Sequence, residues 1–197
     1  KYKHNNKWLD IVSRKETVPL SKGRDTTITI RKTHHGPIIS DIHPLLKDKK
    51  YVVSMSWVGN QITHEISALS KFSLVKNWKD FSSVAKEFSV PGQNIVYADT
   101  AGNIGWRAAA LIPIRKEGGS LLPRPGWDPD YDWKGFIPFE EMPYLYNPKK
   151  GYIATANNKI VDDTFPYYIS NQWAEPSRIE RIEEYIQSKE KMSVNDM

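Results

Sequence analysis

Hydrophobic and polar residues alternate along much of the first 58 residues, which is the pattern of half-buried β-strands. Residues 26–30, Thr-Thr-Ile-Thr-Ile, show it most clearly. β-branched residues are frequent in these stretches, which also favours strands. The segments that we expect to be strands are residues 8–13, 16–20, 25–32, 38–39 after the Gly36-Pro37 turn, and 51–58.

The hydrophobic period then changes to three and four residues, which predicts helices. Residues 65–72 and 77–88 carry this pattern, with Asn77 as a plausible N-cap of the second helix. A last helix is expected from about Pro176 to Lys189, because proline is favoured in a first helical turn. Residues 93–99 and 103–109 read as two strands joined by a turn at Gly102.

Residues 113–148 are rich in proline and aromatic residues, a composition that forbids a long helix. After them comes the apolar run of residues 151–156, which stops at Asn157 and Asn158. Such a run predicts a buried strand followed by a turn. We therefore divide the chain into residues 1–112 with strands and a helix pair, the segment 113–150, and residues 151–197 with a core strand and a helix. Together these elements predict an α+β fold.

The asparagine pair can do more than form a turn. A carboxamide at the end of a strand can present a neutral N–H donor to an oxyanion that develops in a transition state. Arg178, near the start of the last helix, could donate to the Asn157 side-chain oxygen and so orient the NH2 group. The alternative interpretation is an asparagine-rich turn and an ordinary surface arginine.

Composition narrows the function classes. The chain has 39% hydrophobic and 26% charged residues, a net charge of +5 and a pI near 9.2. Its basic residues are interspersed with acidic ones, and the short clusters at residues 47–50 and 149–150 are typical of solvated loops, so no nucleic-acid partner is expected. The chain lacks cysteine, which excludes a thiol nucleophile and thiolate metal sites. It also lacks an apolar run of roughly 18 residues, so no membrane span is expected.

Two groups of potential metal ligands can be considered in the sequence. Asp128, Asp130 and Asp132 alternate as in a calcium loop, but the glycine and distal glutamate of an EF-hand are missing. His34 and His35 would point to opposite faces of a strand. His4, His43 and His64 have no partner at ligand spacing, and the sequence therefore gives no reason to expect zinc.

Several colinear blocks resemble the penicillin acylase (penicillin amidase) family of N-terminal nucleophile hydrolases. The blocks that carry the resemblance are His4-Asn5-Asn6-Lys7-Trp8, residues 13–17, residues 31–37, Asn94 to Asp99, Gly102 to Trp106, residues 123–127, residues 131–139, residues 146–148, residues 151–158 and residues 173–179.

The resemblance implies an internal fragment of the β-chain in an αββα sandwich of antiparallel sheets flanked by helices. In that family a serine at the start of the β-chain attacks an amide, with its own α-amino group as base, and forms an acyl-enzyme. The oxyanion-hole asparagine matches Asn157, with Asn158 as the fallback, and the family's neighbouring arginine matches Arg178. The nucleophile is not in this chain, so we expect the fragment alone to be inactive and the full-length protein to hydrolyse linear amide bonds.

The resemblance also implies partners and a location. The substrate would be a small N-acyl amide, such as a penicillin or an acyl-homoserine lactone, and the remainder of the β-chain and an α-chain would come from the same precursor. No cofactor is required, although a structural calcium ion is possible, with Asp162 and Asp163 as candidate ligands. The family implies a periplasmic or secreted protein. The alternative function is a non-catalytic, ligand-binding module lined by the aromatic residues between Trp127 and Tyr146.

Overall fold

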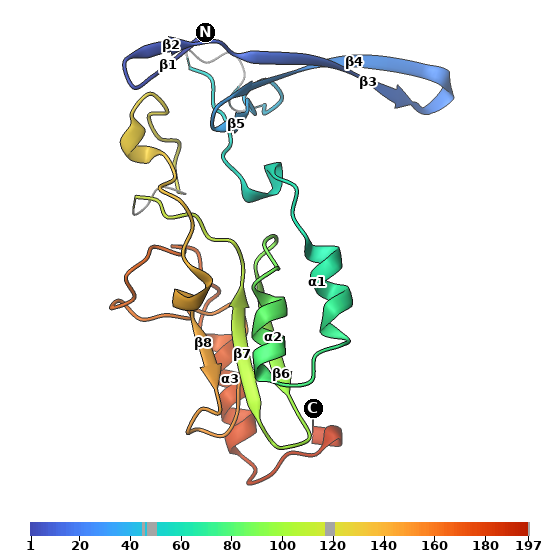
Figure 1. Ribbon diagram of the computed structural model, residues 1–197, viewed down its shortest axis with the longest axis vertical. Helices are drawn as coiled ribbons and strands as arrows, with labels where there is room; N and C mark the ends of the chain where they lie inside the picture. The colour runs from blue at the N-terminus through green and yellow to red at the C-terminus, as the bar shows by residue number, and fades with distance from the viewer. Residues whose placement is uncertain (45, 47–50, 117–120, 197) are drawn as a thin grey trace. The chain divides into compact units, whose positions relative to one another are not determined.

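A computed structural model describes residues 1–44, 46, 51–116 and 121–196 (Figure 1). The described chain divides into two compact units, Lys1–Ile62 with Arg115–Gly135, and Thr63–Ile114 with Phe136–Met197. The basic cluster at residues 47–50 lies outside the described residues. The three-part division made from the sequence stays a prediction.

The first unit contains two antiparallel β-structures. Strands β1 (Tyr2–His4) and β2 (Lys7–Leu9) form a hairpin, and β3 (Val12–Leu20), β4 (Arg24–Thr33) and β5 (Gly36–Pro37) form a three-stranded sheet in that order. β3 and β4 pair without interruption from Val12–Lys32 to Leu20–Arg24. The alternation therefore predicted β4 and most of β3. It missed β1, joined β2 to the start of β3, and wrongly placed a break after Ser13, where the ladder is continuous.

The second unit is built around the antiparallel sheet of β6 (Gln93–Ala98), β7 (Ile104–Ala109) and β8 (Tyr144–Tyr146), with β7 in the middle. Its helices are α1 (Glu65–Phe72), α2 (Trp78–Ala85) and α3 (Ser177–Gln187). The side chain of Asn77 accepts a hydrogen bond from the Asp80 N–H at 2.9 Å, so the predicted N-cap is confirmed. Antiparallel sheets with helices confirm the predicted α+β class (Figure 1).

Strand β7 is buried on both faces because its side chains alternate between two apolar clusters. Ala109 packs with the buried residues of α1, α2 and the segment that follows α2. Trp106 and Ala108 pack on the opposite face against residues of the long segments around β8. The second cluster also includes Ile153, which anchors the segment that leads to the asparagine pair.

Three predicted strands differ from the structure. The expected Gly36-Pro37 turn is itself strand β5, and of residues 38–39 only Ile38 forms a single bridge. Residues 51–57 form no strand, and Val58 begins the 3₁₀ turn η2 (Val58–Asn60). The segment reaches residues 37–40 through local contacts, such as Met55 N–H to the Pro37 carbonyl at 2.9 Å and an isolated bridge of Ile38 with Ser54. Residues 151–158 form no strand and have bends at Gly151 and at Ala156 and Asn157, so the core strand predicted there is wrong. An apolar run becomes a strand only when another strand pairs with it, and among the described residues no strand pairs with this one.

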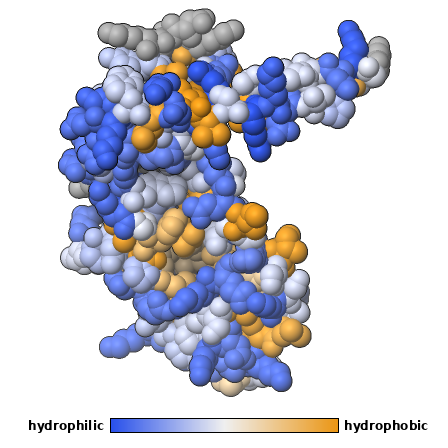
Figure 2. Space-filling view, turned by 45° about the horizontal axis from the view of Figure 1, so that its top comes forward, coloured by the Kyte–Doolittle hydropathy of each residue, from blue (hydrophilic) through white to orange (hydrophobic). Residues whose placement is uncertain are grey.

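Residues 113–148 contain no long helix within their described part, as predicted, but they do contain β8 and the short 3₁₀ turns η3 (Pro129–Tyr131) and η4 (Phe139–Glu141). Hydrophobic residues also appear at the surface among hydrophilic ones (Figure 2). Ile62 is 96% exposed and Ile66 of α1 is 79% exposed. None of the described helices has the length and apolar character needed to cross a membrane.

Candidate functional site

Asn157 lies at an exposed turn whose backbone is held from two sides. Ala156 before it is buried, at 3% exposure, and the Asn157 carbonyl accepts a hydrogen bond from the Ala174 N–H at 2.9 Å. The backbone of Asn157 has a φ of 61°, in the left-handed region that asparagine adopts more readily than most residues. The buried neighbour and the fixed backbone therefore direct the Asn157 side chain outward.

Arg178 contacts this turn from the first part of α3. Its Nη1 donates to the Asn157 Oδ1 at 3.2 Å and to the Ala156 carbonyl at 3.3 Å. A guanidinium has donors only, so the Asn157 oxygen, and not its nitrogen, must face Arg178. Among the described residues, the Asn157 Nδ2 group has no hydrogen-bond acceptor. The structure therefore brings the two residues together in the arrangement that orientation of the carboxamide requires, while their roles in a reaction stay predictions.

The fallback residue, Asn158, has a different environment. Its Oδ1 accepts the Ala156 N–H at 3.0 Å, and its Nδ2 donates to the Lys159 carbonyl at 3.0 Å. Both ends of this carboxamide are thus used within the turn. Of the two adjacent asparagines, Asn157 is the one whose N–H donor is available to a ligand.

The calcium candidates are engaged in local contacts. Asp162 accepts hydrogen bonds from the Thr164 N–H at 2.9 Å and the Thr164 hydroxyl at 2.5 Å, and the hydroxyl contact chiefly lowers the pKa of Asp162. Asp163 pairs with Lys159. Calcium takes about six to eight oxygen ligands, and among the described residues neither aspartate belongs to a cluster of three potential ligands. These residues alone do not fit a calcium site, and calcium binding by the protein stays a prediction.

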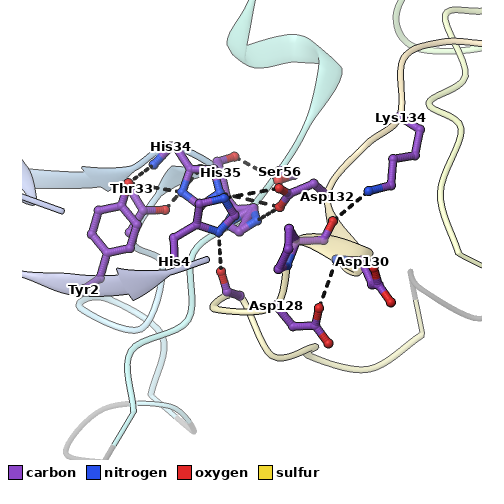
Figure 3. Close-up of polar contacts among 12 residues, drawn as sticks. Tyr2, His4, Thr33, His34, His35, Ser56, Asp128, Asp130, Asp132 and Lys134 are labelled. Atoms are coloured by element: carbon purple, nitrogen blue, oxygen red, sulfur yellow. Dashed lines mark hydrogen bonds and ion pairs between the residues drawn. The ribbon is translucent and has the colours of Figure 1, made fainter. Parts of the chain in front are cut away.

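A second polar cluster, in the first unit, gathers three histidines around Asp132 (Figure 3). The nearest contacts of its carboxylate are with His35 Nε2 at 2.9 Å, His4 Nε2 at 3.3 Å and His34 Nε2 at 3.5 Å. The His34 and His35 ring centroids are 3.7 Å apart, so the prediction that the two side chains point to opposite faces is wrong. The reason is that both residues occupy the turn between β4 and β5, where strand alternation does not apply.

Electrostatics inside this cluster disfavour several positive charges together. Burial lowers the pKa of His35, and the neighbouring His34 lowers it further. Burial likewise lowers the pKa of His34, with an added effect from His4, while Asp132 acts in the opposite direction. The other two aspartates of the alternating motif do not join the cluster, since the Asp128 side chain accepts the Asp130 N–H and caps η3.

Sequence reasoning missed this cluster because its members are far apart in the chain. The one local signal was Asn5-Asn6, both with positive φ, which mark the tight turn of the β1–β2 hairpin and place His4 at its end. The contact of that hairpin with the loop before Asp132, through the Asn5 N–H and the Trp127 carbonyl at 3.0 Å, has no sequence signature.

Comparisons with known proteins relate the whole chain to amide-bond acylases. The family model described as penicillin amidase matches residues 1–197. The penicillin G acylase of Escherichia coli is 32% identical over 206 residues, covering 98% of this chain and 23% of that protein. The acyl-homoserine lactone acylase QuiP of Pseudomonas fluorescens is 32% identical over 181 residues, covering 92% of this chain and 22% of that protein.

A solved structure, the thermostable penicillin G acylase from Alcaligenes faecalis in orthorhombic form, superimposes with a TM-score of 0.76. Its sequence is 28% identical, and the match covers 99% of this chain and 34% of that chain. The chain thus spans less than a quarter of the length of these two curated relatives.

Proposed function

The chain belongs to the penicillin amidase family, and from this premise we propose that the protein carrying it hydrolyses the linear amide bond of an N-acyl substrate through an acyl-enzyme. The similarity to a solved penicillin G acylase agrees with the N-terminal nucleophile hydrolase fold that the sequence blocks implied. The relatives' names specify penicillin G and acyl-homoserine lactones, and a substrate of one of these classes is part of the proposal.

Within this mechanism, the Asn157 Nδ2 group donates to the oxygen of the scissile carbonyl as negative charge develops there. Arg178 acts as a positioning residue, because its hydrogen bond to Oδ1 fixes which end of the carboxamide faces the substrate. The single observation that carries the proposal is the orientation of the Asn157 carboxamide. Arg178 holds its Oδ1, and the Nδ2 donors of this exposed side chain are available to a substrate. A donor oriented before the reaction stabilises an oxyanion without reorganisation at the moment of attack.

The attacking group is assigned to another part of the protein. The family resemblance implies a serine whose own α-amino group takes its proton, and it matches neither group to residues 1–197. We therefore expect residues 1–197 alone to show no hydrolysis. The proposal routes no step through calcium.

Exposed apolar surfaces support the remainder of the same precursor as the partner. Beyond the two residues that pair with β5, β3 and β4 form a long two-stranded ribbon whose residues are mostly exposed, and an isolated hairpin of this kind is marginally stable in water. Val12 is 55% exposed on it, and Ile66 protrudes from α1 in the other unit. The rest of a β-chain and an α-chain would bury such surfaces, as the hydrophobic effect requires.

The test is to replace Asn157 by glycine in the full-length protein. Glycine adopts the positive φ of this position without strain, so the change removes the carboxamide and keeps the turn. We expect kcat for an N-acyl anilide to fall by about 100- to 1,000-fold, the usual cost of one oxyanion donor. Asn158→Ala is the matched comparison. It removes two hydrogen bonds of the turn but leaves the available donor of Asn157 in place, so it should lower kcat clearly less than Asn157→Gly does.

The outcomes separate the assignments. Near-normal turnover by a folded Asn157→Gly protein would remove the role of Asn157. A large kcat loss in Asn158→Ala but not in Asn157→Gly would transfer the role to the fallback residue. An acyl-chain-length series on the wild type, comparing phenylacetyl with longer aliphatic acyl groups, then tests the substrate class.

A further inference from the structure

The histidine cluster of the first unit joins three segments that are distant in sequence. His4 ends β1, His34 and His35 form the turn after β4, and Asp132 follows η3 (Figure 3). The coordinating atoms of His4, His34 and Asp132 all lie within 4.8 Å of one another. Nothing in the acylase chemistry proposed above uses these residues.

The hydrogen bonds of His4 show which of its nitrogens is available. Its Nδ1 lies 3.3 Å from the Gly126 carbonyl oxygen, and a carbonyl can only accept, so Nδ1 carries the proton. In the neutral ring the lone pair of Nε2 then faces the Asp132 Oδ2 at 3.3 Å. Two lone pairs that face each other repel, and a cation between them turns this repulsion into attraction. A positive group between His4 Nε2 and Asp132 Oδ2 would therefore stabilise this arrangement.

The partners of His34 allow the same arrangement. Its Nδ1 lies 3.1 Å from the Tyr2 hydroxyl, which also accepts the His34 backbone N–H at 3.0 Å. A hydroxyl oxygen has two lone pairs, so it can accept from Nδ1–H while Nε2 stays free for a ligand bond. Outer hydrogen bonds of this kind fix the tautomer and orientation of metal-bound histidines.

His35 contributes a contact of a different kind. Its Nε2 lies 2.9 Å from the Asp132 Oδ1, at hydrogen-bond distance. When Nε2 carries the proton, it donates to one carboxylate oxygen and leaves the other to face the cation. This is the support that a metal-binding carboxylate usually receives from its surroundings.

We propose that His4 Nε2, His34 Nε2 and one Asp132 oxygen bind a divalent transition-metal ion of the Zn²⁺ class, with Tyr2, Gly126 and His35 as the outer hydrogen-bond partners. Two imidazole nitrogens and one carboxylate are a ligand set suited to zinc and its neighbours, whereas calcium and magnesium prefer oxygen ligands alone. Solvent supplies the remaining ligands, since the site is open to water. The side chains of the three histidines and of Asp132 are 16–32% exposed. The ion pins the β1–β2 hairpin and the β4–β5 turn to the loop that carries Asp132.

The experiment uses the full-length protein, stripped of metal with a chelator and dialysed, and then titrated with Co²⁺ as a spectroscopic probe and Zn²⁺ as the competitor. We expect one equivalent of Co²⁺ with a d–d absorption band, displaced by Zn²⁺ but not by equimolar Ca²⁺. The band is lost in His34→Gln and in Asp132→Asn, which remove a ligand atom or the charge while keeping side chains of similar size. His35→Ala weakens Zn²⁺ binding by about 10- to 100-fold, as the loss of an outer partner does.

The matched control is His64→Ala, which removes an exposed histidine before α1 and leaves the cluster intact. It should bind Co²⁺ and Zn²⁺ like the wild type. Circular dichroism and thermal unfolding show whether each metal-free variant is folded. If either Asp132→Asn or His34→Gln is unfolded, the other variant still tests the loss of a ligand.

Three results would overturn the proposal. One is no Co²⁺ band in the wild type, which would mean that a proton rather than a metal ion lies between His4 and Asp132. Another is a band that survives both His34→Gln and Asp132→Asn in folded protein. The third is displacement of the bound Co²⁺ by equimolar Ca²⁺, which would contradict the nitrogen ligands.

Discussion

Arg178 of α3 holds the carboxamide of Asn157 from 21 residues away in the sequence, with its Nη1 3.2 Å from Oδ1. The same nitrogen also donates to the Ala156 carbonyl at 3.3 Å, so one guanidinium fixes both the backbone and the side chain of the turn. Because α3 is an ordered helix and the turn is anchored by buried Ala156, the pair can keep its geometry before any substrate arrives.

Replacing Arg178 by alanine should therefore impair turnover more than substrate binding. Without the guanidinium the Asn157 carboxamide can rotate, and a misplacement of about 1 Å can cost up to about 100-fold in rate. We expect kcat of the full-length protein to fall by about 10- to 100-fold with KM little changed, and Arg178→Lys to recover part of the loss, because lysine restores a donor without the planar fork.

The matched control is Arg181→Ala, one turn further along α3, where the guanidinium pairs with Glu184 at 2.7 Å and does not contact the turn. That variant should leave kcat unchanged. If Arg178→Ala also turned over at the wild-type rate, the positioning role of Arg178 would be wrong.

Local patterns in the sequence predicted the helices and the hairpin strands well. The stripe of Trp78, Phe81 and Ala85 forms one face of α2, and the Asn77 cap lies where residue chemistry puts it. Periodicity fixes these elements because their hydrogen bonds close within the element or across a short turn.

The failures have the opposite origin. Residues 51–58 and 151–158 look like strands, but a strand depends on a partner that no local pattern can supply. The histidine cluster likewise depends on a contact between His4 and Asp132, which are 128 residues apart in the sequence. The Asn157–Arg178 contact was anticipated because the sequence blocks that resemble the family include both residues.

Glu65 should make stability depend on pH in acid. Its Oε1 accepts the N–H groups of Ser89 at 3.1 Å and Val90 at 2.9 Å, which ties α1 to the segment before β6. Its hydrogen bond with Thr63 is the largest cause that lowers its pKa from 4.5 to about 2. A carboxyl whose pKa is depressed by folding stabilises the protein above its unfolded pKa, and this contribution is lost as the pH falls through the folded value.

Chemical unfolding of wild type and Glu65→Gln at a series of pH values measures this effect. The difference in free energy of unfolding should be constant above pH 4.5 and should shrink as the pH falls toward about 2. Lys71→Gln is the control. Lys71 lies on the same helix as Glu65, and its loss removes the ion pair with Glu87 but leaves the Glu65 contacts intact. A Glu65→Gln difference that did not change between neutral pH and pH 2 would contradict the assignment.

Tyr97 should produce the corresponding effect in alkali. Its hydroxyl donates to the Asp99 carboxylate at 2.6 Å, and this hydrogen bond is the main reason that the pKa of Tyr97 rises from 10.0 to about 12. A raised pKa means that the contribution to stability is complete below pH 10 and is lost as the pH rises through about 12. The stability difference between wild type and Tyr97→Phe should follow this course.

The phenolate absorbance gives an independent measurement. The wild-type titration should contain a component near pH 12 that is absent from Tyr97→Phe. A hydrogen bond to Glu141 also raises the pKa of Tyr167, so the comparison with Tyr97→Phe is what assigns the component. In Asp99→Asn the late component should move toward the ordinary tyrosine value, because the acceptor has lost its charge. A titration curve that Tyr97→Phe leaves unchanged in this range would show that the hydrogen bond does not control Tyr97.

A side chain at Gly105 in β7 should destabilise the protein, because the indole of Trp78 occupies the space that its Cβ would need. A Cβ at this position would lie 2.2 Å from Cζ3 of Trp78. The indole cannot easily move away, since it stacks on Phe81 with ring centroids 5.3 Å apart and on Tyr146 at 4.8 Å. Overpacking of this kind costs about 1–3 kcal/mol, so Gly105→Ala should lower the free energy of unfolding by that amount.

A double-mutant cycle with Trp78→Leu separates this clash from any effect of alanine on the strand itself. In the Trp78→Leu background the smaller, flexible side chain leaves room for the new methyl group, so Gly105→Ala should cost much less there than in the wild type. The coupling between two residues in contact is typically about 0.5–3 kcal/mol, which urea unfolding can resolve. An equal cost of Gly105→Ala in both backgrounds would mean that the indole does not press on this glycine, and the packing of α2 on β7 would have to be described differently.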